Sequence, residues 1–81
     1  MPIQLKQGSD HLLFRGLTGA SGSTAILTNW GETQTAIVSF SGVHKVKNAV
    51  TGEEVSVTTD NGNTLATVTV AAGTSAVLMT E

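Results

Sequence analysis

Apolar and polar residues alternate along most of this chain, and the clearest example is the stretch from residue 25 to residue 40. An alternation with a period of two is typical of half-buried strands, which turn every second side chain towards a core. The pattern predicts two strands joined as a hairpin by a turn at residues 29–32. The residues expected on their apolar faces are Ala25, Leu27, Ala36, Val38 and Phe40.

Shorter alternating segments predict further strands on both sides of this stretch. Pro2 precedes the first of them, which suits the start of a strand at a sheet edge. Val55 and Val57 are expected to point inward, and Leu65 is expected to change face through a bulge. The further strands expected are Ile3–Lys6, His11–Leu17, Val43–Val50, Glu53–Thr59, Thr64–Val70 and Thr74–Thr80.

Turn signals separate these strands. Asn61-Gly62 is the strongest, because a type I′ hairpin turn requires positive φ and these two residue types accept it. The segment from Thr18 to Ser23 contains mostly Gly, Ser and Thr, and it is expected to be a long flexible loop.

The spacing of the strands predicts the fold class. Seven or eight short strands with turns every 8–12 residues are typical of an all-β, antiparallel, Greek-key-like β-sandwich, and an open barrel is the alternative. Residues 1–81 are expected to form a single domain, because 81 residues are too few for two. Thirteen Thr, nine Val and three Ile favour strands, and no apolar stripe of helical spacing is present.

Charge narrows the range of partners. The net charge is −2, only 12% of residues are charged, and the cations are too scattered for a nucleic-acid surface: Lys6, Arg15, Lys45 and Lys47. Such a low charge indicates a surface partly covered by another protein, or alternatively a sheet surface covered by Thr and Ser. The sequence predicts no membrane span and no signal peptide, and it contains no Cys.

Catalytic chemistry is not predicted. The adjacent Glu53 and Glu54 would point to opposite faces of a strand, so they cannot form a glycosidase pair. His11 and His44 lack partners at metal-ligand spacing, and the segment from Gly19 to Gly22 lacks the Lys of a phosphate loop. We therefore expect no catalytic residues, no metal and no cofactor.

Trp30 is the one aromatic residue placed in a predicted turn. An exposed Trp in that position could stack on a sugar ring, whereas a Trp folded back would cap the core or pack on a neighbouring domain. The ligand-binding residues predicted by the first interpretation are Trp30, Asn29, Glu32 and Gln34.

Five short segments carry a series of motifs in a fixed order: Leu12–Arg15, Ala25–Gly31, Val46–Val55, Asn61–Leu65 and Ala72–Leu78. Through them the chain, from Leu12 onward, resembles the small C-terminal β-sandwich domain that follows the catalytic barrel in many glycoside hydrolases, such as α-amylase-like enzymes and α-galactosidases. The usual acid before the Thr-Gly-Glu turn is replaced here by Asn48 or Ala49.

The resemblance implies a sandwich without catalytic residues, which packs on a catalytic domain, stabilises it and sometimes contributes to carbohydrate binding. Three hypotheses follow. The first is a non-catalytic accessory domain of a carbohydrate-active enzyme, whose partner is the catalytic domain. The second is a carbohydrate-binding module that uses Trp30. The third is a free-standing structural protein that assembles through exposed edge strands.

Overall fold

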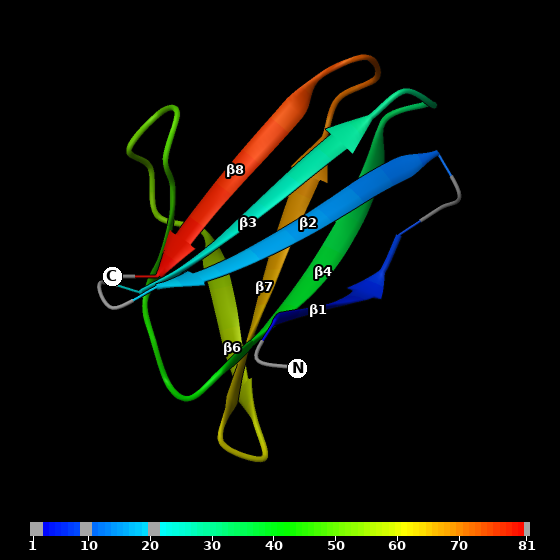
Figure 1. Cartoon of the computed structure of the whole chain (residues 1–81). Helices are drawn as coiled ribbons and strands as arrows, with labels where there is room; N and C mark the ends of the chain where they lie inside the picture. Colours follow the sequence, from blue (N-terminus) through cyan, green and yellow to red (C-terminus); the bar gives the residue numbers. More distant parts are fainter. Residues whose placement is uncertain (1–2, 9–10, 20–21, 81) are drawn as a thin grey trace.

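The structure, a computed structural model, describes residues 3–8, 11–19 and 22–80 (Figure 1). Within that part of the chain all regular structure is β, which confirms the predicted fold class, and no helix is long and apolar enough to cross a membrane. The strands are β1 (Ile3–Gln7), β2 (Leu12–Gly19), β3 (Gly22–Asn29), β4 (Gln34–Ser41), β5 (Val46–Asn48), β6 (Ser56–Asp60), β7 (Asn63–Val70) and β8 (Ser75–Thr80).

The strands form two four-stranded antiparallel sheets that pack face to face. Sheet A has the order β1-β4-β7-β6, and sheet B has the order β2-β3-β8-β5. Figure 1 shows β2, β3 and β8 side by side in sheet B, with strands of sheet A crossing behind them. Each sheet keeps its own edges, so the molecule is a sandwich and not an open barrel.

The stretch from residue 25 to residue 40 forms two strands as predicted, but they are not a hairpin. β3 belongs to sheet B and β4 to sheet A, so the connection between them crosses from one sheet to the other. The connection from β7 to β8 crosses back, and β4 pairs with β7 while β3 pairs with β8. The alternation identified the buried face of each strand correctly, but two strands that each have one apolar face can share a sheet or oppose each other across the core.

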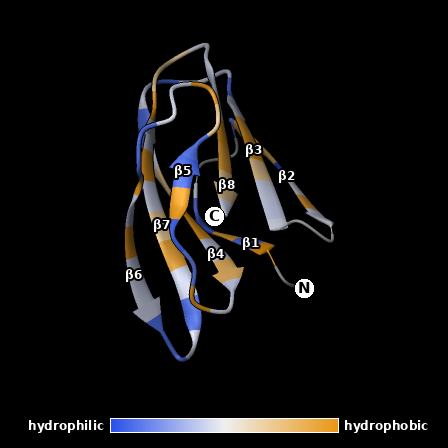
Figure 2. Cartoon of the chain, turned by 90° about the vertical axis from the view of Figure 1, so that its left-hand side faces the viewer, coloured by the Kyte–Doolittle hydropathy of each residue, from blue (hydrophilic) through white to orange (hydrophobic). Residues whose placement is uncertain are grey.

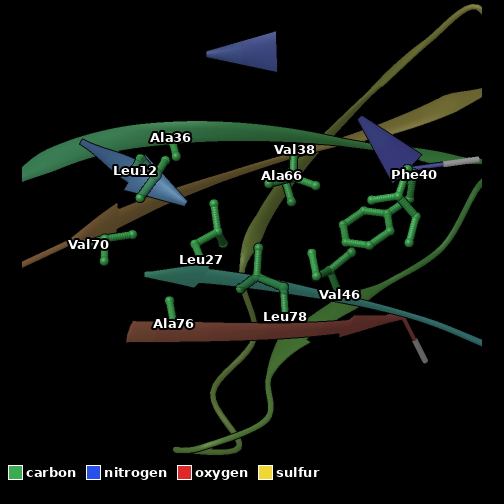
Figure 3. Packing of buried hydrophobic residues seen from close by; sticks show 12 residues of the cluster. Leu12, Leu27, Ala36, Val38, Phe40, Val46, Ala66, Val70, Ala76 and Leu78 are labelled. Atoms are coloured by element: carbon green, nitrogen blue, oxygen red, sulfur yellow. The ribbon is translucent and has the colours of Figure 1, made fainter. Parts of the chain in front are cut away.

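The core lies between the central strands of the two sheets. Side chains from β4 and β7 point towards those from β3 and β8, and Phe40 fills the space beside Val46 (Figure 3). The alternation that produces this arrangement is visible as apolar and polar bands along the strands (Figure 2). All the predicted apolar positions of the central stretch are fully buried: Ala25, Leu27, Ala36, Val38 and Phe40.

The β6–β7 hairpin confirms the prediction for its turn. Asn61 and Gly62 both have positive φ, 50° and 80°, as a type I′ turn requires. The bulge predicted at Leu65 is absent, because β7 pairs with β4 in unbroken register from Asn63 to Val70. The irregularity lies instead in the edge strand β1, where an extra residue is accommodated between Leu5 and Gln7.

The loop predicted from Thr18 to Ser23 is largely part of a hairpin. Thr18 pairs with Ser23 and Gly19 pairs with Gly22, so β2 and β3 are joined through residues 20 and 21, which lie outside the described residues. The composition is typical of a loop, but cross-strand pairing extends to both glycines. Whether the connecting residues are flexible, as expected, lies outside the described part of the chain.

The strand predicted from Val43 to Val50 is reduced to the three residues of β5. The preceding segment crosses between the sheets and is held by the buried Thr64, whose hydroxyl donates to the Gly42 carbonyl (2.7 Å) and accepts from the His44 N–H (2.9 Å). Val57 faces the sandwich interior but is 38% exposed. β6 is an edge strand, and β5 at the corresponding edge of sheet B is too short to cover it.

The central position of Phe40 can be tested by truncation. We expect Phe40→Ala to lower the free energy of unfolding by about 3–5 kcal/mol, because it removes a fully buried ring and leaves a cavity. Total stabilities are only about 5–15 kcal/mol, so much of the stability should be lost. Urea denaturation followed by circular dichroism measures the change. Leu17→Ala, at a 54% exposed position, is the control, and an equal loss in both variants would contradict the proposed core.

Candidate functional site

The β3–β4 and β7–β8 connections lie at the same end of the sandwich (Figure 1), and His11, just before β2, meets the first of them. Backbone hydrogen bonds join them. The Asn29 N–H donates to the Thr74 carbonyl (2.9 Å), and the Trp30 N–H donates to the His11 carbonyl (3.0 Å). The Ala72 N–H donates to the Thr33 hydroxyl (3.1 Å). This end is therefore built from segments that are far apart in the sequence.

The side chain of Asn29 organises this end. It is 1% exposed, and its Nδ2 donates to the carbonyls of Glu32 (2.7 Å) and Val70 (3.0 Å). Its Oδ1 accepts from the Gly31 N–H (2.9 Å) and from Nε2 of Gln34 (3.1 Å). An amide has two N–H donors and two acceptor lone pairs, so all of its hydrogen-bonding capacity is used within the chain.

Asn29 was expected to contact a ligand, and the structure gives it a different role. Its amide is buried and fully engaged, and it does not line the adjacent concavity. It fixes the start of the β3–β4 connection and ties that connection to the end of β7 through Val70. The side chain thus satisfies backbone groups of the chain itself, and ligand binding by Asn29 stays a prediction that no observation here supports.

Trp30, the next residue, points outward. It is 57% exposed, and its ring meets that of His11 edge to face, with centroids 6.3 Å apart and planes at 74°. Gly31 makes this approach possible, because a Cβ at that position would lie only 2.7 Å from the His11 Cβ. The indole is thus held at the surface by a second ring, not folded back into the core.

Trp30 and His11 form one side of a concavity of about 640 Å³, a size that suits small-molecule sites. Exposed Glu32 and Thr33 make the concavity open to solvent. Its lining offers an aromatic surface, a carboxylate, a hydroxyl and an amide, which together suit a neutral polar ligand with an apolar face. The lining residues are His11, Trp30, Gly31, Glu32, Thr33 and Gln34.

Three of the four predicted ligand-binding residues, Trp30, Glu32 and Gln34, therefore lie around one concavity, and ligand binding by them stays a prediction. Three lining residues are not among the predicted ones: His11, Gly31 and Thr33. Of these, His11 comes from a distant part of the chain. The place of His11 follows from the β2–β3 register, in which Leu12 pairs with Asn29, so that His11 meets Trp30 one residue further along.

Among the described residues, no group of three or more His, Cys, Asp or Glu side chains could hold a metal ion.

The outer faces of the two sheets differ in chemistry. Sheet A presents mainly hydroxyl-bearing side chains, and cross-strand neighbours such as Thr35 and Thr69 lie directly opposite each other. Ile37 and Leu65 on this face are half-buried. The hydroxyl-bearing residues on this face are Thr35, Ser39, Ser41, Ser56, Thr58, Thr67 and Thr69.

Sheet B presents a mainly apolar outer face, here called the sheet B face. Leu13 and Leu17 are 57% and 54% exposed, and Met79 is 37% exposed. Ile26 and Val77 lie between them, because Ile26 pairs with Val77 in the register of β3 and β8. These neighbouring residues form an apolar patch on one sheet face, in contrast to exposed apolar residues that are scattered singly.

Comparison with known proteins finds no family model that matches the chain and no matching curated protein. The resemblance to glycoside hydrolase terminal domains therefore enters the functional argument only as a proposal.

The structural role of Asn29 can be tested by truncation. We expect Asn29→Ala to lower the free energy of unfolding by about 2–4 kcal/mol, because it removes the buried and part-buried hydrogen bonds that the side chain makes to the Glu32 and Val70 carbonyls and to the Gly31 N–H. The control is Thr28→Ala, which removes an exposed hydrogen bond to Ser75 and should cost below about 1 kcal/mol. Urea unfolding of both variants measures the difference, and similar values would show that Asn29 does not hold this end together.

Proposed function

We propose that this chain is a non-catalytic accessory domain of a carbohydrate-active enzyme, which packs through the sheet B face on a catalytic domain and stabilises it. The observation that carries the proposal is the contrast between the two outer faces. Sheet A is covered by Thr and Ser, as a solvated sheet is, whereas Leu13, Leu17 and Met79 stand exposed on sheet B. Burying such side chains releases free energy in proportion to the apolar area removed from water.

Size and charge support the same proposal. A chain of 81 residues buries a smaller fraction of its surface than a large domain, so packing on a partner adds a useful share of stability. The 12% charged residues leave few ionic groups to be desolvated in an interface. The motif order that resembles glycoside hydrolase terminal domains supports the choice of a catalytic barrel as the partner.

Carbohydrate binding at the Trp30 concavity is a second candidate function, and a specific observation favours it. Trp30 is more than half exposed although it is the largest apolar side chain of the protein, and His11 supports it from the side. A flat, exposed ring beside Glu32 and Gln34 can stack on the apolar face of a sugar while the polar groups bind its hydroxyls. The two functions use different surfaces, so one domain can have both.

The accessory function can be tested with catalytic barrels. The chain is fused to an α-amylase-like and to an α-galactosidase-like barrel, each without its own terminal sandwich. We expect the fusion to raise the melting temperature of at least one barrel by about 2–4 °C or more, the shift that 1 kcal/mol produces in a domain of that size. The isolated chain should hydrolyse no chromogenic glycoside.

Paired variants identify the face responsible. Leu13→Asp with Leu17→Asp should abolish the stabilisation, whereas Thr67→Asp with Thr69→Asp, on the outer face of sheet A, should preserve it. All four positions are exposed, so circular dichroism should show folded domains in both cases. Stabilisation of neither barrel, or glycosidase activity in the chain alone, would refute the accessory function.

The second candidate predicts a response of the single Trp to oligosaccharides. Titration with linear gluco- and galacto-oligosaccharides should shift or quench the fluorescence of Trp30. By calorimetry, Trp30→Ala should weaken binding by about three- to tenfold or more, the range expected when an aromatic contact is lost. Trp30→Phe keeps a ring and should bind with intermediate affinity. No response across a broad glycan array would exclude this function.

A further inference from the structure

The sheet B face contains a small concavity with a cation beside it. Register places Leu13 opposite Thr28 and Arg15 opposite Ile26, so these four residues form a square on the outer surface of β2 and β3. They line a hollow of about 320 Å³, large enough for one apolar side chain. Arg15 is exposed and is flanked along β2 by Leu13 and Leu17.

Among the described residues of this face, Arg15 is a cation without a carboxylate opposite it in the sheet, unlike Lys47. The residues of β2, β3, β8 and β5 that face outward include two cations, Arg15 and Lys47, and no acid. Lys47 lies opposite Glu54 through an isolated bridge at the edge of the sheet, so a carboxylate is close to it. Arg15 has no acidic neighbour in the register of β2 with β3.

We infer that the sheet B face binds a partner surface that inserts an apolar side chain into the hollow and places a carboxylate against Arg15. The inference rests on the proposed docking function and specifies the chemistry of the partner. A guanidinium presents a planar set of N–H donors that matches a carboxylate, and its stem packs against apolar neighbours. Leu13 and Ile26 supply those neighbours on both strands.

A second copy of the chain fits this face less well. A two-fold symmetric interface brings the same patch of each copy together, and the outward-facing strand residues of this patch include no acid to meet Arg15. Glu54, at the edge of the patch, already lies opposite Lys47. Like charges that are placed opposite each other are destabilising. A partner of opposite charge relieves that repulsion, and the partner inferred is therefore an acidic, apolar protein surface.

The chemistry can be tested with three probes that have linear alkyl tails of about the same length and different head groups: octanoate, octyltrimethylammonium and octanol. Methyl NMR spectra of the folded chain at neutral pH report binding at Leu13 and Ile26. We expect octanoate to bind about two- to fivefold more tightly than the cationic probe, which corresponds to an exposed ion pair of up to about 1 kcal/mol. Octanol should lie between them.

Matched variants assign the preference to one cation. Arg15→Gln should remove the preference for octanoate but retain the probe-induced NMR shifts at Leu13 and Ile26. Lys47→Gln should leave the preference for octanoate unchanged. Both positions face outward, so both variants should fold. Preservation of the preference in Arg15→Gln would refute the assignment.

Other outcomes separate this inference from the proposed function. If the three probes bind with equal affinity but the chain still stabilises a barrel, the carboxylate preference is refuted and the docking function is upheld. Failure of every probe to shift Leu13 or Ile26 would refute the hollow as a binding site. A concentration-dependent dimer in sedimentation experiments, abolished by Leu13→Asp, would show that the face binds a second copy and would overturn the inference.

Discussion

The buried amide of Asn29 is the interaction on which one whole end of the molecule depends. It lies where β3 leaves sheet B for sheet A, and through the Val70 carbonyl it is attached to the strand that makes the reverse crossing. Connections between sheets expose backbone groups that no strand partner can satisfy, and burying them unpaired costs free energy. One side chain with two donors and two acceptor lone pairs meets this requirement and thereby fixes the geometry of the loop beyond it.

Trp30 owes its exposure to this constraint. Because Asn29 is held inward and Gly31 allows close contact with His11, the intervening indole is directed to the surface. The concavity beside it is therefore a consequence of how two crossings are joined. Thr64 has a comparable role at another crossing, where its hydroxyl holds the segment between β4 and β5. The sandwich thus satisfies its connections with short polar side chains.

The two outer faces of the sandwich differ in chemistry. In a two-sheet sandwich only the inner faces are needed for the core, so the outer faces are free to differ. The Thr- and Ser-covered face of sheet A accounts for part of the low charge, and the apolar face of sheet B is the surface proposed to pack on a partner. Of the two explanations considered for the low charge, a sheet covered by Thr and Ser is present on sheet A, whereas cover by another protein stays a proposal.

The sequence by itself determined the positions of most strands, the buried faces of the stretch from residue 25 to residue 40 and the Asn61-Gly62 turn, because these depend on a period of two and on local backbone conformation. Only the tertiary structure decided which strands share a sheet. Alternation marks the apolar face of β3 and of β4 equally well whether they pair or oppose each other. For the same reason the sequence did not predict that His11 contacts Trp30, because that contact depends on the β2–β3 register. It also did not predict that Asn29 points inward, because its partner Val70 is distant in the chain. Pairing over long sequence separations is set by how the whole core closes, and no local pattern encodes it.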